Sequence, residues 1–516
     1  MKNVVIIFTR LPIQGETKSR LRDFLDPRAI QQLSQYLLTK NYQAVSELPY
    51  DIQFWVTSRD ESKTLADYLD YDPSCVTVHR QIEGDLGQRM AYAMDQAQLA
   101  GYDKVVLMGT DLYDLSTDHL TEAFRALDYE DIVLAPTYDG GYGLIGWKQS
   151  TPSLFEISGY GGQSVYRKVI TKASQAHLQV HVLPRIHDID TKEDIARVLT
   201  KDEDATFLAQ GEYNANFRFH NGTRLLRIAL GSQLHLAHQI AYEYHALEGL
   251  QESQVTPIPR QLVEDEPLIH AGYLVEDYLP GRPLDYRTDS ANAAKLLARV
   301  HQVPRSNCPE LILADQPFQV MMDEFHTMFR VYQEWDQRDL HVEQRIQNLL
   351  DRLGIFALDQ PLEHPCIINT ELNSSNFLIN HDASDSYIID WEKPLIGERE
   401  QDLGHFLAPT TTRWKTDYLY DRMGIQQFVV AYNAKSEVAI DEDKLTQYLL
   451  FTCLRGLTWC AMAYVQYQSQ TKVAQSQATY KVIKNYLSDE FLTMIERYFD
   501  ELLGYRGGGR CHLLNV

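Results

Sequence analysis

The chain has 516 residues, more than one hydrophobic core usually supports, so two or three domains are expected. Hydrophobic residues make up 44% and charged residues 23%, which is typical of a globular protein, and the six cysteines show no metal-ligand spacing. The formal net charge of -23 argues against a sequence-independent nucleic-acid binder, but it leaves room for a small anionic substrate in a local basic pocket.

The first part of the chain alternates short apolar strands with helical patterns, as is typical of an α/β sheet built from βαβ units. The first apolar run, Val4–Phe8, is too short for a signal peptide and is predicted to be a buried strand. Further strands are predicted at Ile52–Val56, Lys104–Met108, Asp131–Ala135 and Gly143–Trp147, and helices at Ala29–Ser46, Leu86–Leu99 and Thr117–Leu127. A charged run at 201–204 predicts the end of this domain, residues 1–202.

A different pattern begins after the charged run. Asn221-Gly222 is a strong turn signal and predicts a hairpin between two short strands, Tyr213–His220 and Arg224–Ala229. Helices then dominate, and they are predicted at Ala291–His301, Phe318–Trp335 and His341–Leu353 and over most of Asp441–Leu503. We expect a second domain over 205–505 and a flexible tail over 506–516. No apolar stretch approaches the roughly 20 residues of a membrane span, so a cytoplasmic protein is expected.

One block of the second domain has the composition of a phosphoryl-transfer site. An apolar strand leads into Asn369-Thr370-Glu371, and Asn376 follows five residues after the glutamate. A second apolar strand ends on Asp390, which is followed by Trp391. Phosphoryl transfer needs one group that orients or deprotonates the attacking hydroxyl, and an amide and a carboxylate that hold Mg²⁺ against the phosphates of ATP.

This block resembles the catalytic loop of the aminoglycoside phosphotransferase and choline kinase family. That family has His-Gly-Asp, then an Asn five residues after the Asp, and then Ile-Asp-Trp, whereas this chain has Asn369 and Glu371 at the first and third positions. The resemblance implies an α+β protein-kinase-like domain that uses ATP and Mg²⁺. Its implied site residues are Glu371 as the catalytic carboxylate, Asn376 and Asp390 as metal ligands, and Asn216, Arg227 and Glu243 as nucleotide-binding residues.

Each of these residues also has a purely structural interpretation. Arg227 and Glu243 could form an ordinary surface ion pair, and His301 is expected to be a core or helix-end histidine. The extra methylene of Glu371 moves its carboxylate by roughly an ångström, which matters where geometry sets the rate. Two hypotheses therefore stand for this domain, a competent small-molecule kinase and a degenerate nucleotide-binding domain.

The loop after the first strand carries a proline, a glycine and two basic residues, Pro12, Gly15, Lys18 and Arg20. Loops at this place in open α/β sheets hold nucleotide phosphates. Together with Gly109-Thr110-Asp111 and later blocks, the loop resembles a bacterial glycosyltransferase-like family with a GT-A fold, known mainly as a domain of unknown function. The later matching blocks are Leu86–Met90, Pro136, Asp139–Tyr142 and Asp188–Thr191.

This second resemblance implies a GT-A-like domain with a Rossmann-like open sheet and a divalent metal that bridges a diphosphate. Asp111, with Asp188 or Asp190, would hold Mg²⁺ or Mn²⁺, which prefer carboxylate oxygens. Lys18 and Arg20 would neutralise phosphate charge. The structural alternative is that Asp111 caps the helix that follows its strand.

The two resemblances together predict a bifunctional transferase. One hypothesis joins a nucleotide-dependent glycosyl- or nucleotidyltransferase to an ATP-dependent kinase of small alcohols, and the other is a nucleotide-binding scaffold. The expected cofactor is Mg²⁺ or Mn²⁺, and the expected substrates are ATP, a second nucleotide or nucleotide-sugar, and small molecules. No nucleic-acid partner is expected, and the oligomeric state stays open.

Overall fold

The structure is a computed structural model that describes residues 2–211, 213–232, 234–354, 361–469 and 476–504. The expected flexible tail, 506–516, lies outside these residues. Contacts between Cα atoms divide the chain into two compact units. The first comprises Met1–Gly231 with Val263–Tyr273, and the second comprises Ser232–Leu262 with Leu274–Val516. The domain boundary near residue 202 stays a prediction.

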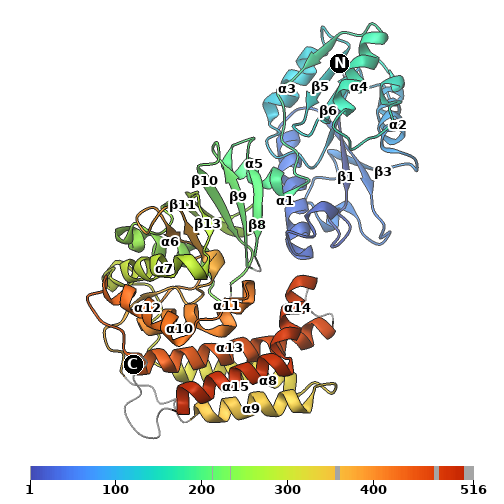
Figure 1. Ribbon diagram of the computed structural model, residues 1–516. Coiled ribbons are helices and arrows are strands. Elements are labelled where there is room, and N and C mark those ends of the chain that lie inside the picture. The colour runs from blue at the N-terminus through green and yellow to red at the C-terminus, as the bar shows by residue number, and fades with distance from the viewer. Residues whose placement is uncertain (1, 212, 233, 355–360, 470–475, 505–516) are drawn as a thin grey trace. The chain divides into compact units, whose positions relative to one another are not determined.

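A seven-stranded sheet forms the centre of the first unit (Figure 1), with strand order β3-β2-β1-β4-β6-β5-β7. Neighbouring strands are parallel except where β6 runs antiparallel to both β4 and β5. The strands are β1 (Asn3–Arg10), β2 (Asp51–Thr57), β3 (Val76–Arg80), β4 (Lys104–Gly109), β5 (Ile132–Pro136), β6 (Tyr142–Trp147) and β7 (Val180–Val182).

Helices cover both faces of this sheet, because alternate side chains of the strands point to opposite faces. Val5 and Ile7 of β1 belong to one apolar core, and Val4 and Ile6 to the other. The first core includes side chains of α1 (Pro27–Ser46) and α3 (Thr117–Ala126), and the second includes side chains of α2 (Leu86–Leu99) and α4 (Val165–Gln175). Helix α5 (Lys192–Thr200) follows β7. The open α/β sheet predicted for this region is confirmed.

A five-stranded sheet has the order β11-β12-β10-β9-β8. Its strands are β8 (Thr206–Gln210), β9 (Asn214–Phe219), β10 (Arg224–Ala229), β11 (Pro259–Glu266) and β12 (Ala271–Asp277). The hairpin predicted at Asn221-Gly222 is confirmed, since β9 and β10 pair antiparallel around it and both turn residues have positive φ. Helix α6 (Gln239–Gly249) lies between β10 and β11 in the chain.

The second unit is mainly helical (Figure 1). Its longer helices are α7 (Tyr286–His301), α8 (Pro317–Gln333), α9 (Leu340–Gly354), α10 (Arg399–Leu407), α11 (Pro409–Lys415), α12 (Arg422–Asn433), α13 (Glu442–Gln468), α14 (Gln477–Tyr486) and α15 (Asp489–Gly504). Short strands carry the expected phosphoryl-transfer block, namely β14 (Cys366–Ile368), β15 (Phe377–Ile379), β16 (Tyr387–Ile388) and β17 (Leu395–Gly397).

Helix α13 is long and apolar enough to cross a membrane, which the sequence analysis did not anticipate. In the structure 72% of its apolar window is buried inside the protein, and its neighbours include α8, α10, α11 and α14. A core helix surrounded by other helices has this composition because it is apolar on all sides. Among the described residues it is the only helix of this kind.

Candidate active sites

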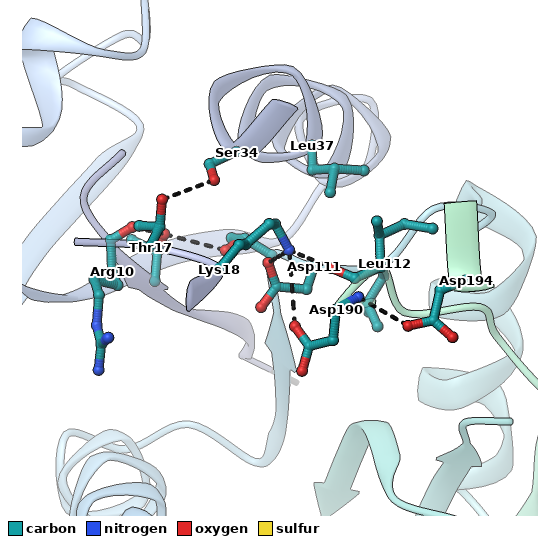
Figure 2. A network of polar contacts seen from close by, with 12 residues as sticks. Arg10, Thr17, Lys18, Ser34, Leu37, Asp111, Leu112, Asp190 and Asp194 are labelled. Atoms are coloured by element: carbon teal, nitrogen blue, oxygen red, sulfur yellow. Dashed lines mark hydrogen bonds and ion pairs between the residues drawn. The ribbon is translucent and has the colours of Figure 1, made fainter. Parts of the chain in front are cut away.

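The first candidate site lies at the carboxyl ends of β1 and β4, which are neighbours in the sheet. Lys18 follows β1 and adopts a left-handed backbone conformation, with φ of 44°, that non-glycine residues rarely take. Its side chain is only 3% exposed, and its ammonium nitrogen lies 2.5 Å from Asp111 Oδ1 and 2.5 Å from the carbonyl oxygen of Ile189 (Figure 2). Asp190 Oδ1 lies 3.9 Å from the same nitrogen.

A short segment after β7 brings two more carboxylates to this place. Leu112 and Asp188 form an isolated antiparallel bridge, and the amide of Ile189 donates to the carbonyl of Asp111 at 3.0 Å. Asp188 and Asp190 therefore join Asp111 although they are far from it in sequence. Arg20 lies 3.9 Å from Asp190 Oδ2. The five residues predicted for this site are thus brought together at one edge of the sheet.

The carboxylates of this cluster are held against their preference for water. Burial raises the pKa of Asp188 to about 7, and the nearby Asp139 and Asp190 carboxylates add to this shift. Burial and the Asp111 carboxylate likewise raise the pKa of Asp190, while Lys18 and Arg20 oppose the rise. Carboxyl groups crowded in this way are typical of sites that receive a cation or a proton.

The residues present fit a divalent metal that shares its coordination with a ligand. Within the described ranges, no group of three or more His, Cys, Asp or Glu side chains is arranged to hold a metal ion by itself. Mg²⁺, however, is often bound by one or two carboxylates together with substrate phosphates, and Asp111 and Asp190 offer two. The Lys18 ammonium lies between these two carboxylates (Figure 2) and already supplies one positive charge.

A cavity of about 550 Å³ opens beside this cluster. It extends along the ends of β1, β2 and β4 to the residue that follows β3, and its walls include Thr9, Gln81, Arg89, Thr110 and Asp188. The side-chain amide of Gln81 donates to the backbone carbonyls of Trp55 and Thr9, at 2.8 and 3.4 Å. The sequence analysis missed Thr9 and Gln81. They meet at the cavity only because β1, β2 and β3 pair side by side in the sheet.

The second candidate site is the loop that follows β14 in the second unit. Asn369 donates from its side chain to the Asp390 carbonyl at 2.9 Å and accepts from the Glu371 amide at 3.1 Å. The Asn376 side chain donates to the Glu371 carbonyl at 2.7 Å, which leaves its amide oxygen as an acceptor. Glu371 and Asn376 are therefore joined by a direct hydrogen bond, and Asn369 links Glu371 to Asp390.

Asp402 on α10 fixes the backbone of this loop. Its carboxylate, which is fully buried, accepts from the amides of Asn369 and Thr370, both at 2.8 Å. Thr370 needs such support because its φ is 72°, a conformation that β-branched residues avoid. His301 is buried beside Asp402, at 3.2 Å, and contacts the Tyr432 hydroxyl at 2.8 Å. This is the core position that the sequence analysis expected for His301.

Glu371 is paired with a lysine that the sequence analysis missed. Lys393 Nζ lies 2.6 Å from Glu371 Oε1, and Arg455 of α13 lies 4.0 Å from the same oxygen. Burial opposes the charge of Glu371, but Lys393 and Arg455 hold its pKa below the usual value. The lowered pKa keeps the carboxylate ionised, and its side chain remains 29% exposed and thus accessible. Lys393 is only three residues after Asp390, whereas no sequence signal identifies Arg455.

The remaining predicted nucleotide-binding residues are placed as follows. Asn216 of β9 and Arg227 of β10 are register partners in the five-stranded sheet. Arg227 is 6% exposed and Glu243 of α6 is 3% exposed. An ordinary surface ion pair, the structural alternative for these two residues, does not fit such burial.

Two families match the chain. Residues 42–161 match the family described as "Uncharacterized protein conserved in bacteria (DUF2064)", and residues 204–456 match the family described as "Phosphotransferase enzyme family". The chain is a fusion of a DUF2064 domain and a phosphotransferase-family domain. Its fold is accordingly a Rossmann-like open sheet followed by a kinase-like α+β domain. No match was found among the curated proteins.

Solved structures resemble each part. A protein of Desulfovibrio desulfuricans G20, assigned as a nucleotide-diphospho-sugar transferase, is 28% identical over 40% of this chain and 89% of its own, with a TM-score of 0.37. A protein of Ralstonia eutropha JMP134, assigned as an aminoglycoside phosphotransferase, is 16% identical over 59% and 97%, with a TM-score of 0.45. Choline kinase of Cryptosporidium parvum Iowa II is 14% identical over 59% and 90%, with a TM-score of 0.42.

Proposed function

We propose that the chain is a bifunctional transferase. The phosphotransferase-family domain moves the γ-phosphoryl group of ATP to a small alcohol, and the DUF2064 domain transfers a nucleotidyl or glycosyl group from a second nucleotide. Mg²⁺ or Mn²⁺ serves both domains as the cofactor. The observation that carries the proposal is the hydrogen-bonded set of Glu371, Asn376 and Asp390.

In the phosphotransferase domain, each residue of this set has a distinct task. Asn376 and Asp390 offer amide and carboxylate oxygens, the ligands that Mg²⁺ prefers. When bound, the metal neutralises charge on the phosphates of ATP. Glu371 accepts a hydrogen bond from the substrate hydroxyl and orients it for attack. Lys393 and Arg455 keep the Glu371 carboxylate ionised and therefore a weak base. Its main contribution is to orient the substrate hydroxyl, and it takes up the hydroxyl proton late in the reaction.

One observation favours the alternative of a nucleotide-binding scaffold. The pair between Glu371 and Lys393, at 2.6 Å, occupies one oxygen of the carboxylate that would meet the substrate. The second oxygen remains for the substrate hydroxyl, and the hydrogen bonds that hold the loop in place favour a functional site. Both hypotheses assign nucleotide binding to the same three residues, namely Asn216, Arg227 and Glu243.

In the DUF2064 domain, the nucleotide lies in the cavity next to Asp111. Lys18 and Arg20 neutralise phosphate charge, and Asp111, Asp188 and Asp190 supply carboxylates for the metal. Lys18 is already bound to Asp111, so a phosphate group competes with this carboxylate for the ammonium. Metal bound at Asp111 removes that competition, which makes nucleotide and metal binding cooperative.

Calorimetric titration of the full chain with ATP, with and without Mg²⁺, tests the phosphotransferase half. The wild type should bind only with Mg²⁺, and Asp390→Ala should abolish binding to the phosphotransferase domain. The Asp111→Ala variant is the matched control, because it removes a carboxylate from the nucleotide site of the other domain and should retain the ATP·Mg²⁺ binding that depends on Asp390. Equal affinity of the wild type and Asp390→Ala would refute the metal assignment.

A further inference from the structure

A second cavity, of about 720 Å³, adjoins the nucleotide cavity of the first unit. The two cavities share four wall residues, Arg20, Thr137, Asp188 and Asp190. A molecule in the second cavity would therefore reach the shared carboxylates Asp188 and Asp190 from another cavity than the nucleotide. Such a place suits the acceptor of a transfer reaction, which must lie beside the nucleotide.

The walls of this second cavity are firmly built. Gly140 has φ of 90° and leaves no room for a Cβ atom beside the Gln163 carbonyl. The Gly140 carbonyl accepts from the Tyr166 amide at 3.0 Å. The turn after β5 and the start of α4 are thus fixed against each other. Arg167 on the first turn of α4 and Arg185 after β7 both line the cavity.

Three acidic residues of this cavity already form hydrogen bonds or ion pairs within the protein. Asp194 accepts from the amides of Asp190 and Thr191 and pairs with Arg197 at 3.0 Å. Asp139 accepts from Thr137 and from the Gly141 amide. In the same way Glu203 pairs with His187 at 2.6 Å. These carboxylates stabilise turns and helix ends, so their negative charge is partly neutralised in place.

Arg167 and Arg185, by contrast, form no such ion pair with the described residues. Within the described part of the chain, neither Arg167 nor Arg185 has a carboxylate at ion-pair distance, and both are exposed. The Arg185 guanidinium lies over the Tyr138 ring at 5.7 Å, and this ring is stacked at 4.1 Å on His187, which is itself fixed by Asp114 and Glu203. Both guanidinium groups therefore keep their charge available on a wall of the cavity, in a protein whose formal net charge is -23. They suit an anionic group that arrives with a ligand.

We propose that Arg167 and Arg185 bind the phosphate group of an acceptor, a phosphate monoester of a small alcohol. This inference rests on the proposed function and narrows it, because an acceptor phosphate indicates nucleotidyl transfer in the DUF2064 domain. A phosphate oxygen of the monoester attacks the α-phosphorus of a nucleoside triphosphate. The bond from that phosphorus to the oxygen shared with the β-phosphate breaks, and pyrophosphate leaves. The acceptor is then the class of product that phosphoryl transfer to an alcohol supplies.

Hydrogen–deuterium exchange of the full chain with glycerol phosphate as the probe tests this site. We expect protection over 136–141 and 161–167 in the wild type, and no protection with uncharged glycerol. The double variant Arg167→Ala/Arg185→Ala should lose this protection and weaken the apparent affinity at least about tenfold, as removal of charge-assisted hydrogen bonds requires. Arg125→Ala is the matched control, because Arg125 is an exposed arginine on α3 that lines neither cavity.

The outcomes separate this inference from the proposed function. Protection that persists in the double variant, or none in the wild type at millimolar glycerol phosphate, would overturn the acceptor site. If a panel of nucleoside triphosphates with Mg²⁺ still protects 9–20 and 109–111, the nucleotide site stands and only the acceptor assignment fails. If no nucleotide protects those segments, the proposed function of the DUF2064 domain fails as well.

Discussion

In the proposed function, Glu371 is the residue on which the activity of the phosphotransferase domain depends most. The family pattern has an aspartate at this position, and the longer glutamate side chain is accommodated here by Lys393 and Arg455. These two cations fix one carboxylate oxygen and keep the group ionised. These contacts favour a loop that is arranged around a glutamate over an aspartate loop with a displaced side chain, and substitution of Glu371 tests the choice.

We predict that Glu371→Gln keeps ATP·Mg²⁺ binding and loses turnover by at least about a hundredfold, because the amide presents a weaker acceptor to the substrate hydroxyl. Calorimetry and ADP release in the presence of an alcohol panel measure the two quantities. Glu371→Asp should also lower turnover, since the shorter carboxylate no longer reaches Lys393. Faster turnover with aspartate would instead identify the natural glutamate as a weakened kinase residue.

His405 of α10 provides a pH-dependent test of the same site. Burial and the nearby Arg455 charge lower the pKa of His405 from 6.5 to about 4. Between these values the unfolded chain binds a proton that the folded chain does not, so stability is complete above pH 6.5 and falls as the pH approaches 4. Between pH 6.5 and 4 this proton uptake lowers the free energy of unfolding by up to about 3 kcal/mol, and we expect His405→Gln to abolish this decrease. Denaturation at several pH values measures it, and parallel curves for both proteins would contradict the assignment.

At the scale of elements, the strands and helices that the sequence predicted are those with strong apolar patterns. The predicted Leu86–Leu99 helix matches α2, and the predicted hairpin matches β9 and β10. Strands β3 and β7 were missed because they lie at the edges of the sheet and carry exposed or polar residues. Helix α4 was missed because a glycine-rich loop precedes it and no side chain caps its first turn.

The same reasoning explains which site residues could be predicted. Asp111 and Lys18 follow neighbouring strands, and the ends of parallel strands meet at one edge of a sheet. Lys393 and Arg455 form a pair with Glu371 that depends on the packing of α13 against the loop, which no local pattern encodes. Arg167 and Arg185 are likewise brought to one cavity only by the turns after β5 and β7.

We predict that Asp402→Asn destabilises the phosphotransferase domain by about 1–3 kcal/mol. The amide can accept from only one of the two backbone N–H groups, and it leaves a buried donor without an acceptor. Chemical denaturation of the full chain gives the free energy of unfolding. Asp339→Asn is the control, because Asp339 accepts from the amides at the start of α9 and asparagine caps a helix equally well. Equal effects of the two substitutions would contradict the role given to Asp402.

At the scale of the whole molecule, the two family matches raise the question whether the two domains fold independently of each other. We predict that fragments 1–202 and 205–516 each unfold cooperatively, since each contains the region of one family match. Each fragment should be less stable than the same region in the full chain, because the cut removes the contact between Phe24 and Phe217, whose ring centroids lie 6.0 Å apart. Calorimetric unfolding of both fragments measures this. If both are insoluble while the full chain is stable, the boundary near 200–208 is wrong.

The central claim is that one chain carries two transferase activities, and product analysis tests it most directly. The full chain is incubated with Mg²⁺, nucleoside triphosphates and a mixture of small alcohols, and the products are identified by mass spectrometry. We expect a phosphorylated alcohol that disappears in Asp390→Asn, and a nucleotide-linked alcohol that disappears in Asp111→Asn while the phosphorylated alcohol accumulates. Nucleotide binding without either product would contradict the claim and leave a nucleotide-binding scaffold.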